Sequence, residues 1–214
     1  MAHGRSTSPI PMAVGLCFLP AALGLLSQGI APLPLPQRLL ALALGLMLLE
    51  QAHMARVDVQ RVLAARHLGT TPRLRRFTAV LALTIVGEIC GFYLAAAGDP
   101  GFGMVLILLS LLGFNLGANG RFDGEVFQPA GPRHRLGVIA VDLVALGLAL
   151  LWWQNLGRLI IASLLLAITL AYGVVKLYAY VTGRASLSER PPSTSAIHIA
   201  YATQQHPQPT QQNR

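Results

Sequence analysis

Charged side chains are scarce in this sequence: Asp, Glu, Lys and Arg make up only 11% of its 214 residues, whereas 54% are hydrophobic. Soluble domains contain roughly 25% charged residues. The composition therefore excludes an ordinary soluble domain. It predicts an all-α membrane protein with six transmembrane helices, a cytoplasmic amphipathic extension of the second helix and a disordered C-terminal tail.

Cysteine is almost absent as well. Cys17 and Cys90 both lie in apolar stretches, so the sequence indicates neither a disulfide scaffold nor a zinc site. The formal net charge of +8 comes from basic residues in short loops, with no soluble domain to present them to nucleic acid. We expect the lipid bilayer and its anionic headgroups as partners of these loops, and no nucleic acid.

Motifs of catalysis are missing from the sequence. It has no Walker loop, dinucleotide fingerprint, Gly-x-Ser-x-Gly elbow or His-Glu-x-x-His pair. Its two halves do not repeat, so an inverted-repeat transporter is not indicated. We expect neither an enzyme nor a bound cofactor or metal.

Long apolar stretches are abundant, and the one at residues 77–97 contains a single acid, Glu88. A helix of about 20 residues crosses the hydrocarbon core, which places Glu88 near its middle. The expected spans cover residues 12–31, 35–55, 77–97, 101–118, 136–154 and 159–181 of a membrane domain at 12–182. Residues 1–11 form a polar N-terminal tail, and residues 183–214 a disordered one.

The first span contains Pro20, which predicts a kinked helix. The alternative is a signal peptide cleaved after Ala31, although its apolar stretch is longer than such peptides use and Pro32 follows directly. Without this span, five would remain.

Basic residues cluster after the second span. They are Arg56, Arg61, Arg66, Arg73, Arg75 and Arg76. The positive-inside tendency makes this region cytoplasmic, and an even number of spans then makes both termini cytoplasmic. We expect a cell membrane, the bacterial inner membrane.

Small residues recur at four-residue spacing on two adjacent spans, as Gly87 with Gly91 and Gly113 with Gly117. Such pairs let helices approach closely, so we expect the third and fourth spans to pack together.

Polar groups within the spans fall at similar depths. Glu50, Asn115 and Asp142 share one layer, His53 lies one turn below it and Glu88 above it. This predicts a polar pocket formed by the second to fifth helices.

Each polar group also has a purely structural interpretation. Glu88 could be a protonated acid that hydrogen-bonds a neighbouring helix, or the partner of an arginine; otherwise it is a proton or cation site. Arg133 or Arg135 could pair with Asp142, or Asp142 could contact interfacial water, and Asn115 could join helices. Glu50 and His53 form one Glu-x-x-His pair, where a di-iron site needs two.

Three functions are compatible with these observations. The first is an accessory or structural membrane protein that contacts other membrane proteins or its own copies. The second is a small proton- or cation-coupled transporter using Glu88, with Asp142 and Glu50 as relay groups. The third, a membrane oxidoreductase with haem on His53 and His134, has the weakest support.

Overall fold

The computed structural model describes residues 9–123 and 126–181. Six helices in these ranges are long and apolar enough to cross a membrane, which confirms the predicted all-α membrane fold. The helices are α1 (Ile10–Cys17), α2 (Leu19–Ile30), α3 (Leu35–Leu68), α4 (Pro72–Ala96), α5 (Pro100–Gly117), α6 (Leu136–Trp153) and α7 (Arg158–Val181), with α1 and α2 forming one span. The tail predicted at 183–214 lies outside the described residues.

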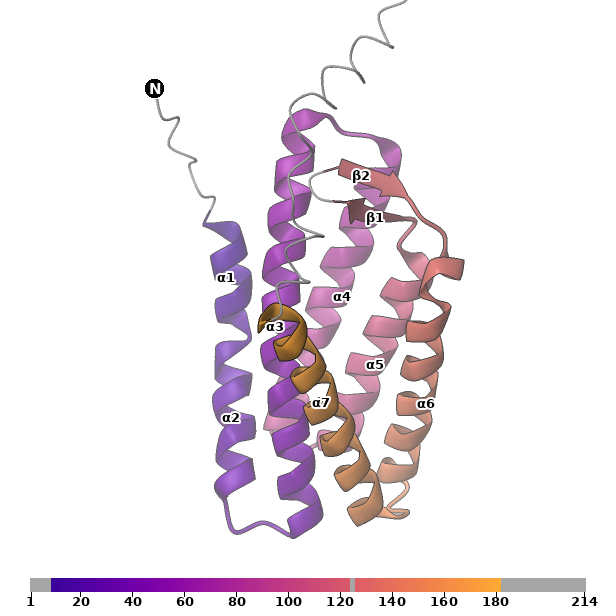
Figure 1. Cartoon of the computed structure of the whole chain (residues 1–214). Helices are drawn as coiled ribbons and strands as arrows, with labels where there is room; N and C mark the ends of the chain where they lie inside the picture. Colours follow the sequence, from indigo (N-terminus) through magenta and orange to yellow (C-terminus); the bar gives the residue numbers. More distant parts are fainter. Residues whose placement is uncertain (1–8, 124–125, 182–214) are drawn as a thin grey trace, which may run out of the picture.

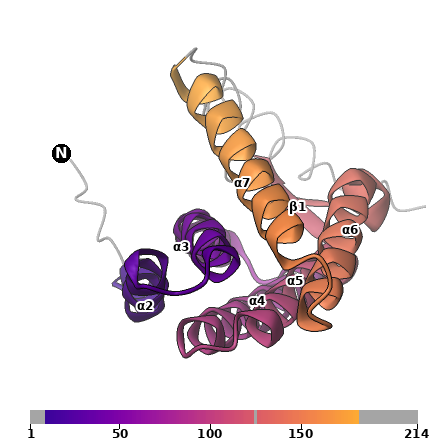
Figure 2. The same cartoon turned by 90° about the horizontal axis from the view of Figure 1, so that it is seen from below.

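The helices form an upright bundle, and α7 crosses it obliquely (Figures 1 and 2). Although α7 follows α6 in sequence, it packs mainly against α3. The connections between α2 and α3 and between α6 and α7 lie at one end of the bundle (Figure 1). At the other end is an antiparallel hairpin of β1 (Gly120–Asp123) and β2 (Val126–Pro129), followed by a 3-10 helix at Pro132–Arg135.

The first span is interrupted where its proline predicts a kink. The α-helical hydrogen bonding breaks at Phe18, between α1 and α2. Pro20 has no N–H to donate to the carbonyl four residues earlier and its ring crowds that carbonyl, which accounts for the break.

Two helices begin with the same local signal, a capping residue followed by proline. Thr71 accepts a hydrogen bond from the Leu74 N–H at the start of α4, and Asp99 accepts one from the Phe102 N–H at the start of α5. Proline suits the first helical position because its missing N–H would have no partner there. These caps separate α3 from α4 and α4 from α5.

The outer faces of the helices carry large apolar side chains. Leu83 is 75% exposed, Ile160 67% and Val144 65%. In water such faces would be unfavourable, whereas hydrocarbon solvates them. The chain is a polytopic integral membrane protein.

The third and fourth spans pack closely, as their glycines predict. A Cβ on Gly91 would lie 2.6 Å from Ile107 Cγ1 and 2.8 Å from the Gly103 carbonyl oxygen. One on Gly87 would collide with the Ser110 side chain. Gly87 and Gly91 therefore let α4 approach α5 at van der Waals distance.

The α5 glycine at the centre of this contact is Gly103, which is not one of the pair that the four-residue spacing indicated. A Cβ on Gly103 would lie 2.5 Å from the Gly91 carbonyl oxygen. Of the predicted pair, Gly113 has no atom within 4 Å of such a Cβ, and Gly117 is in ordinary contact with Val80. Gly113 is thus not a packing residue in this structure, because it faces away from α4.

The predicted extension of the second helix is present, since α3 continues without a break to Leu68. One face is buried, with Ala55, Val62 and Ala65 at 4 to 6% exposed, while Arg56 and Arg66 on the other are exposed. The extension is amphipathic, and its apolar face packs into the protein core.

Candidate functional site

A cavity of about 780 Å³ lies between α3, α4, α5, α6 and α7. Most of its lining is aliphatic, with contributions such as Leu44, Leu81, Leu108 and Val141. The second to fifth spans all contribute, as predicted for the polar pocket. The sixth span, α7, adds a wall that the sequence did not indicate.

Four carboxyl side chains line this cavity: Glu50 and Asp58 from α3, Glu88 from α4 and Asp142 from α6. They are half of the eight acidic residues in the chain. No lysine or arginine is found among the described residues of the lining. In a protein with a formal net charge of +8, the described lining of this cavity thus contains four carboxyl groups and no basic side chain.

Glu88 is the most enclosed of these acids, with only 3% of the residue exposed. It shares a buried face of α4 with Thr84, Gly91 and Ala95, as their helical spacing predicts. Within the described part of the chain, Glu88 makes no hydrogen bond and no ion pair. The hydrogen-bonded and arginine-paired alternatives for this residue are thus not found there.

Asp142 has a defined partner. The Asn115 side-chain amide donates a hydrogen bond of 2.8 Å to the Asp142 carboxylate, linking α5 to α6. Both residues are 8% exposed. Asn115 therefore joins two helices, and it takes the place that sequence reasoning gave to Arg133 or Arg135 as the partner of Asp142.

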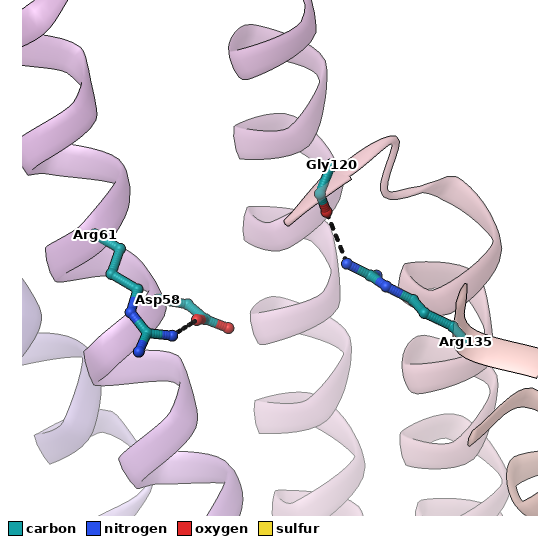
Figure 3. Close-up of polar contacts among 4 residues, drawn as sticks. All are labelled: Asp58, Arg61, Gly120 and Arg135. Carbon is teal, nitrogen blue, oxygen red and sulfur yellow. Dashed lines mark hydrogen bonds and ion pairs between the residues drawn. The ribbon is translucent and has the colours of Figure 1, made fainter. Parts of the chain in front are cut away.

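Asp58 was not predicted as a site residue, because its basic neighbours suggested a solvated surface. The structure places it on the cavity lining, 3.7 Å from the Arg61 guanidinium. Figure 3 shows Asp58 beside Arg61 on the left of the view and Arg135 on the right. Asp58 interacts electrostatically with both arginines and with Glu88. The spacing of Glu50, Met54 and Asp58 at i, i+4 and i+8 could have revealed their common face.

Arg135 ties the β-hairpin to the bundle. Its Nη2 donates a hydrogen bond of 2.8 Å to the Gly120 carbonyl oxygen (Figure 3), and its guanidinium lies 4.9 Å from the centre of the Phe114 ring. The contact with Phe114 is a cation–π interaction. Since Phe114 also lines the cavity, the hairpin is anchored next to the acid-lined space.

The sequence analysis did not predict the hairpin, which lies in the polar segment between the expected spans 101–118 and 136–154. Phe122 and Phe127 pair across the two strands. Both rings pack edge-on against Phe77, and their centres lie 5.5 and 5.3 Å from the centre of the Phe77 ring. A glycine between two phenylalanine-bearing runs, Gly124 followed by Glu125, is typical of a two-residue hairpin loop and could have signalled it.

Only some of the remaining predicted site residues line the cavity. Glu50 is half-buried on its lining, whereas His53 is exposed and absent from it. Among residues 9–123 and 126–181, no three His, Cys, Asp or Glu side chains converge as metal ligands would. Apart from Arg61, the predicted lipid-facing arginines, Arg56, Arg66, Arg73, Arg75 and Arg76, are exposed.

The arrangement is thus an apolar cavity with acids along it, of which Glu88 is enclosed and unpaired in the described part of the chain. It can bind a proton or a positively charged group. The chain was compared with protein-family models, curated proteins and solved structures, and none of them matches it.

Proposed function

We propose that this chain is a small membrane transporter that binds a cation in the acid-lined cavity, with Glu88 as the central binding group. The observation that carries the proposal is the gathering of Glu50, Asp58, Glu88 and Asp142 around one apolar cavity whose described lining has no basic residue.

The argument starts from the cost of a carboxylate in apolar surroundings. An acid near the centre of a membrane helix costs about 2.5 to 3.5 kcal/mol on insertion scales unless it is neutralised or paired. Glu88 has no ion pair with any described residue, and we infer that a bound proton or a bound cation supplies the neutralising charge. These two occupants compete for one carboxyl group, and such competition can couple cation movement to proton movement.

The other acids have different surroundings and therefore different proposed roles. Asp142 is held by Asn115, which fixes its carboxylate toward the cavity. The negative charge of Asp58 is attracted by the positive charges of Arg61 and Arg135. Because Asp58 lies toward the hairpin end of the bundle, we propose it as the relay group between Glu88 and that end.

The direction and partners of the transporter are part of the proposal. The exposed arginines of α3 and α4 gather at the hairpin end, which favours a cytoplasmic location for that end and for both termini, and contact with anionic lipid. The bacterial inner membrane suits this orientation. With so few helices, we expect the chain to work as a homo-oligomer.

Reconstitution into proteoliposomes tests the proposal. Internal pH and membrane potential are followed with dyes while the external cation is varied, for the wild type, Glu88→Gln and the matched control Asp99→Asn. Asp99 caps α5 outside the cavity, and asparagine caps equally well. We expect a cation-dependent flux that Glu88→Gln abolishes and Asp99→Asn retains. Flux in none of the three proteins, with all of them folded, would contradict transport.

The accessory role is the second candidate. It is favoured by the outer face of α7, where Ile160, Val175 and Tyr178 are 62 to 67% exposed and do not line the cavity. Such a face can receive another membrane protein as well as lipid. An accessory role needs no internal acids, however, so the cavity supports transport better.

A further inference from the structure

We propose that the cation bound in this cavity is organic, a molecule of drug size with an apolar body and one positive charge, and not a bare metal ion. The inference rests on the proposed function, since it names the ligand of the same site.

The dimensions of the cavity support an organic ligand. Its volume of about 780 Å³ lies within the range of roughly 300 to 1,000 Å³ that is typical of small-molecule sites. Aliphatic side chains from five helices make up most of the wall. A small hydrated ion would leave this apolar surface without contacts, whereas an apolar body would cover it.

The positions of the acids argue against a metal ion. A hard cation such as Ca²⁺ takes about 6 to 8 oxygen ligands at once. The acids of the cavity come from three helices, and in the described part of the chain no three metal-ligating side chains converge. Glu88, 3% exposed and unpaired there, is instead a single buried charge partner of the kind that one ammonium or phosphonium group needs.

The remaining lining fits ligands of varied shape. Three of the five methionines in the sequence, Met47, Met54 and Met104, line the cavity. Methionine is flexible and polarisable and adapts to different apolar partners. The ring of Tyr172 also lines the cavity, and an aromatic face attracts an organic cation.

Tetraphenylphosphonium is the probe of choice, because tetraphenylborate has nearly the same shape and the opposite charge. Binding to the purified full-length protein in a neutral detergent is measured by calorimetry. We expect the phosphonium to bind, the borate not to bind, and Glu88→Gln to weaken phosphonium binding roughly tenfold or more. Asp99→Asn should bind as the wild type does. Equal binding of the two probes, or equal affinity of Glu88→Gln and wild type, would overturn the inference.

A second variant tests the shape of the site independently of Glu88. Ala145 lines the cavity on α6, and Ala145→Trp would fill part of it. We expect this variant to lose phosphonium binding while its circular dichroism spectrum and its thermal unfolding in detergent stay those of a folded protein. Unchanged phosphonium affinity in the folded variant would place the probe elsewhere and overturn the inference.

The two proposals fail in different ways. A flux of inorganic cations that depends on Glu88, in a protein that does not bind the phosphonium, would overturn the organic ligand and leave transport standing. Phosphonium binding that depends on Glu88, without flux of any cation, would support the ligand and contradict transport.

Discussion

Asn115 donates a hydrogen bond of 2.8 Å to Asp142, and this contact joins α5 to α6 inside the acid-lined cavity. Both side chains are largely buried, so neither can exchange its partner for bulk water. The bond therefore fixes an acid of the proposed site and also stabilises the bundle.

A double-mutant cycle measures this contact. The single variants Asn115→Ala and Asp142→Ala should each destabilise the protein, and the double variant should lose less than their sum. Hydrogen bonds between membrane helices contribute about 0.6 kcal/mol on average and up to about 1.7. Unfolding in mixed micelles with increasing dodecyl sulfate gives the four free energies. Strict additivity would mean that the two side chains do not interact.

Glycine substitution tests the contact between α4 and α5. Gly103→Ala places a Cβ 2.5 Å from the Gly91 carbonyl oxygen, a backbone atom that cannot move aside cheaply. We expect a loss of about 1 to 3 kcal/mol in unfolding free energy, as for other overpacked sites. Gly113→Ala is the matched control, since its Cβ meets nothing within 4 Å. Equal effects of the two substitutions would refute the packing described here.

Arg135→Lys tests how the hairpin is anchored. Lysine keeps the charge but cannot both stack a planar group on Phe114 and donate to the Gly120 carbonyl in the same geometry. We expect faster hydrogen exchange of the strand amides at 120–123 and 126–128, equivalent to about 1 kcal/mol of lost protection. Arg133→Lys, at an exposed position, is the control. Unchanged exchange in Arg135→Lys would show that the phenylalanine cluster alone holds the hairpin.

The extent of the helices could be predicted because membrane spans are determined by local properties. An apolar stretch must be long enough to cross the hydrocarbon, and Pro20, Thr71 and Asp99 mark the breaks and starts through their own backbone chemistry. Glu50, Glu88, Asn115 and Asp142, for which the sequence predicts one pocket, all line one cavity.

What could not be predicted depends on how the helices are rotated and which neighbours they meet. Gly113 and Gly103 have similar sequence surroundings, but only Gly103 faces α4. The face of α3 that Glu50 and Asp58 share borders the cavity because α7 packs against α3, a tertiary contact that the spacing within α3 does not show. The hairpin escaped notice since its two strands are short, although Phe122 and Phe127 flank a glycine turn signal.

The orientation of the chain can be tested through its arginines. Replacing Arg73, Arg75 and Arg76 together by glutamine removes three exposed positive charges at the start of α4. The positive-inside tendency predicts that the third and fourth spans then lose their preferred orientation or invert. Topology reporters fused within the connection at 98–99 and at the C-terminus would detect the change. Reporters that stay on their original sides would show that other charges determine the orientation.

The central claim is that a cation binds in the cavity next to the carboxyl group of Glu88. Dicyclohexylcarbodiimide, an apolar reagent for protonated carboxyl groups, tests it when the labelled peptides are identified by mass spectrometry. The account predicts that Glu88 is labelled in the wild-type protein, and that tetraphenylphosphonium protects it while tetraphenylborate does not. Labelling of Glu88 that is the same with and without the phosphonium would contradict the account.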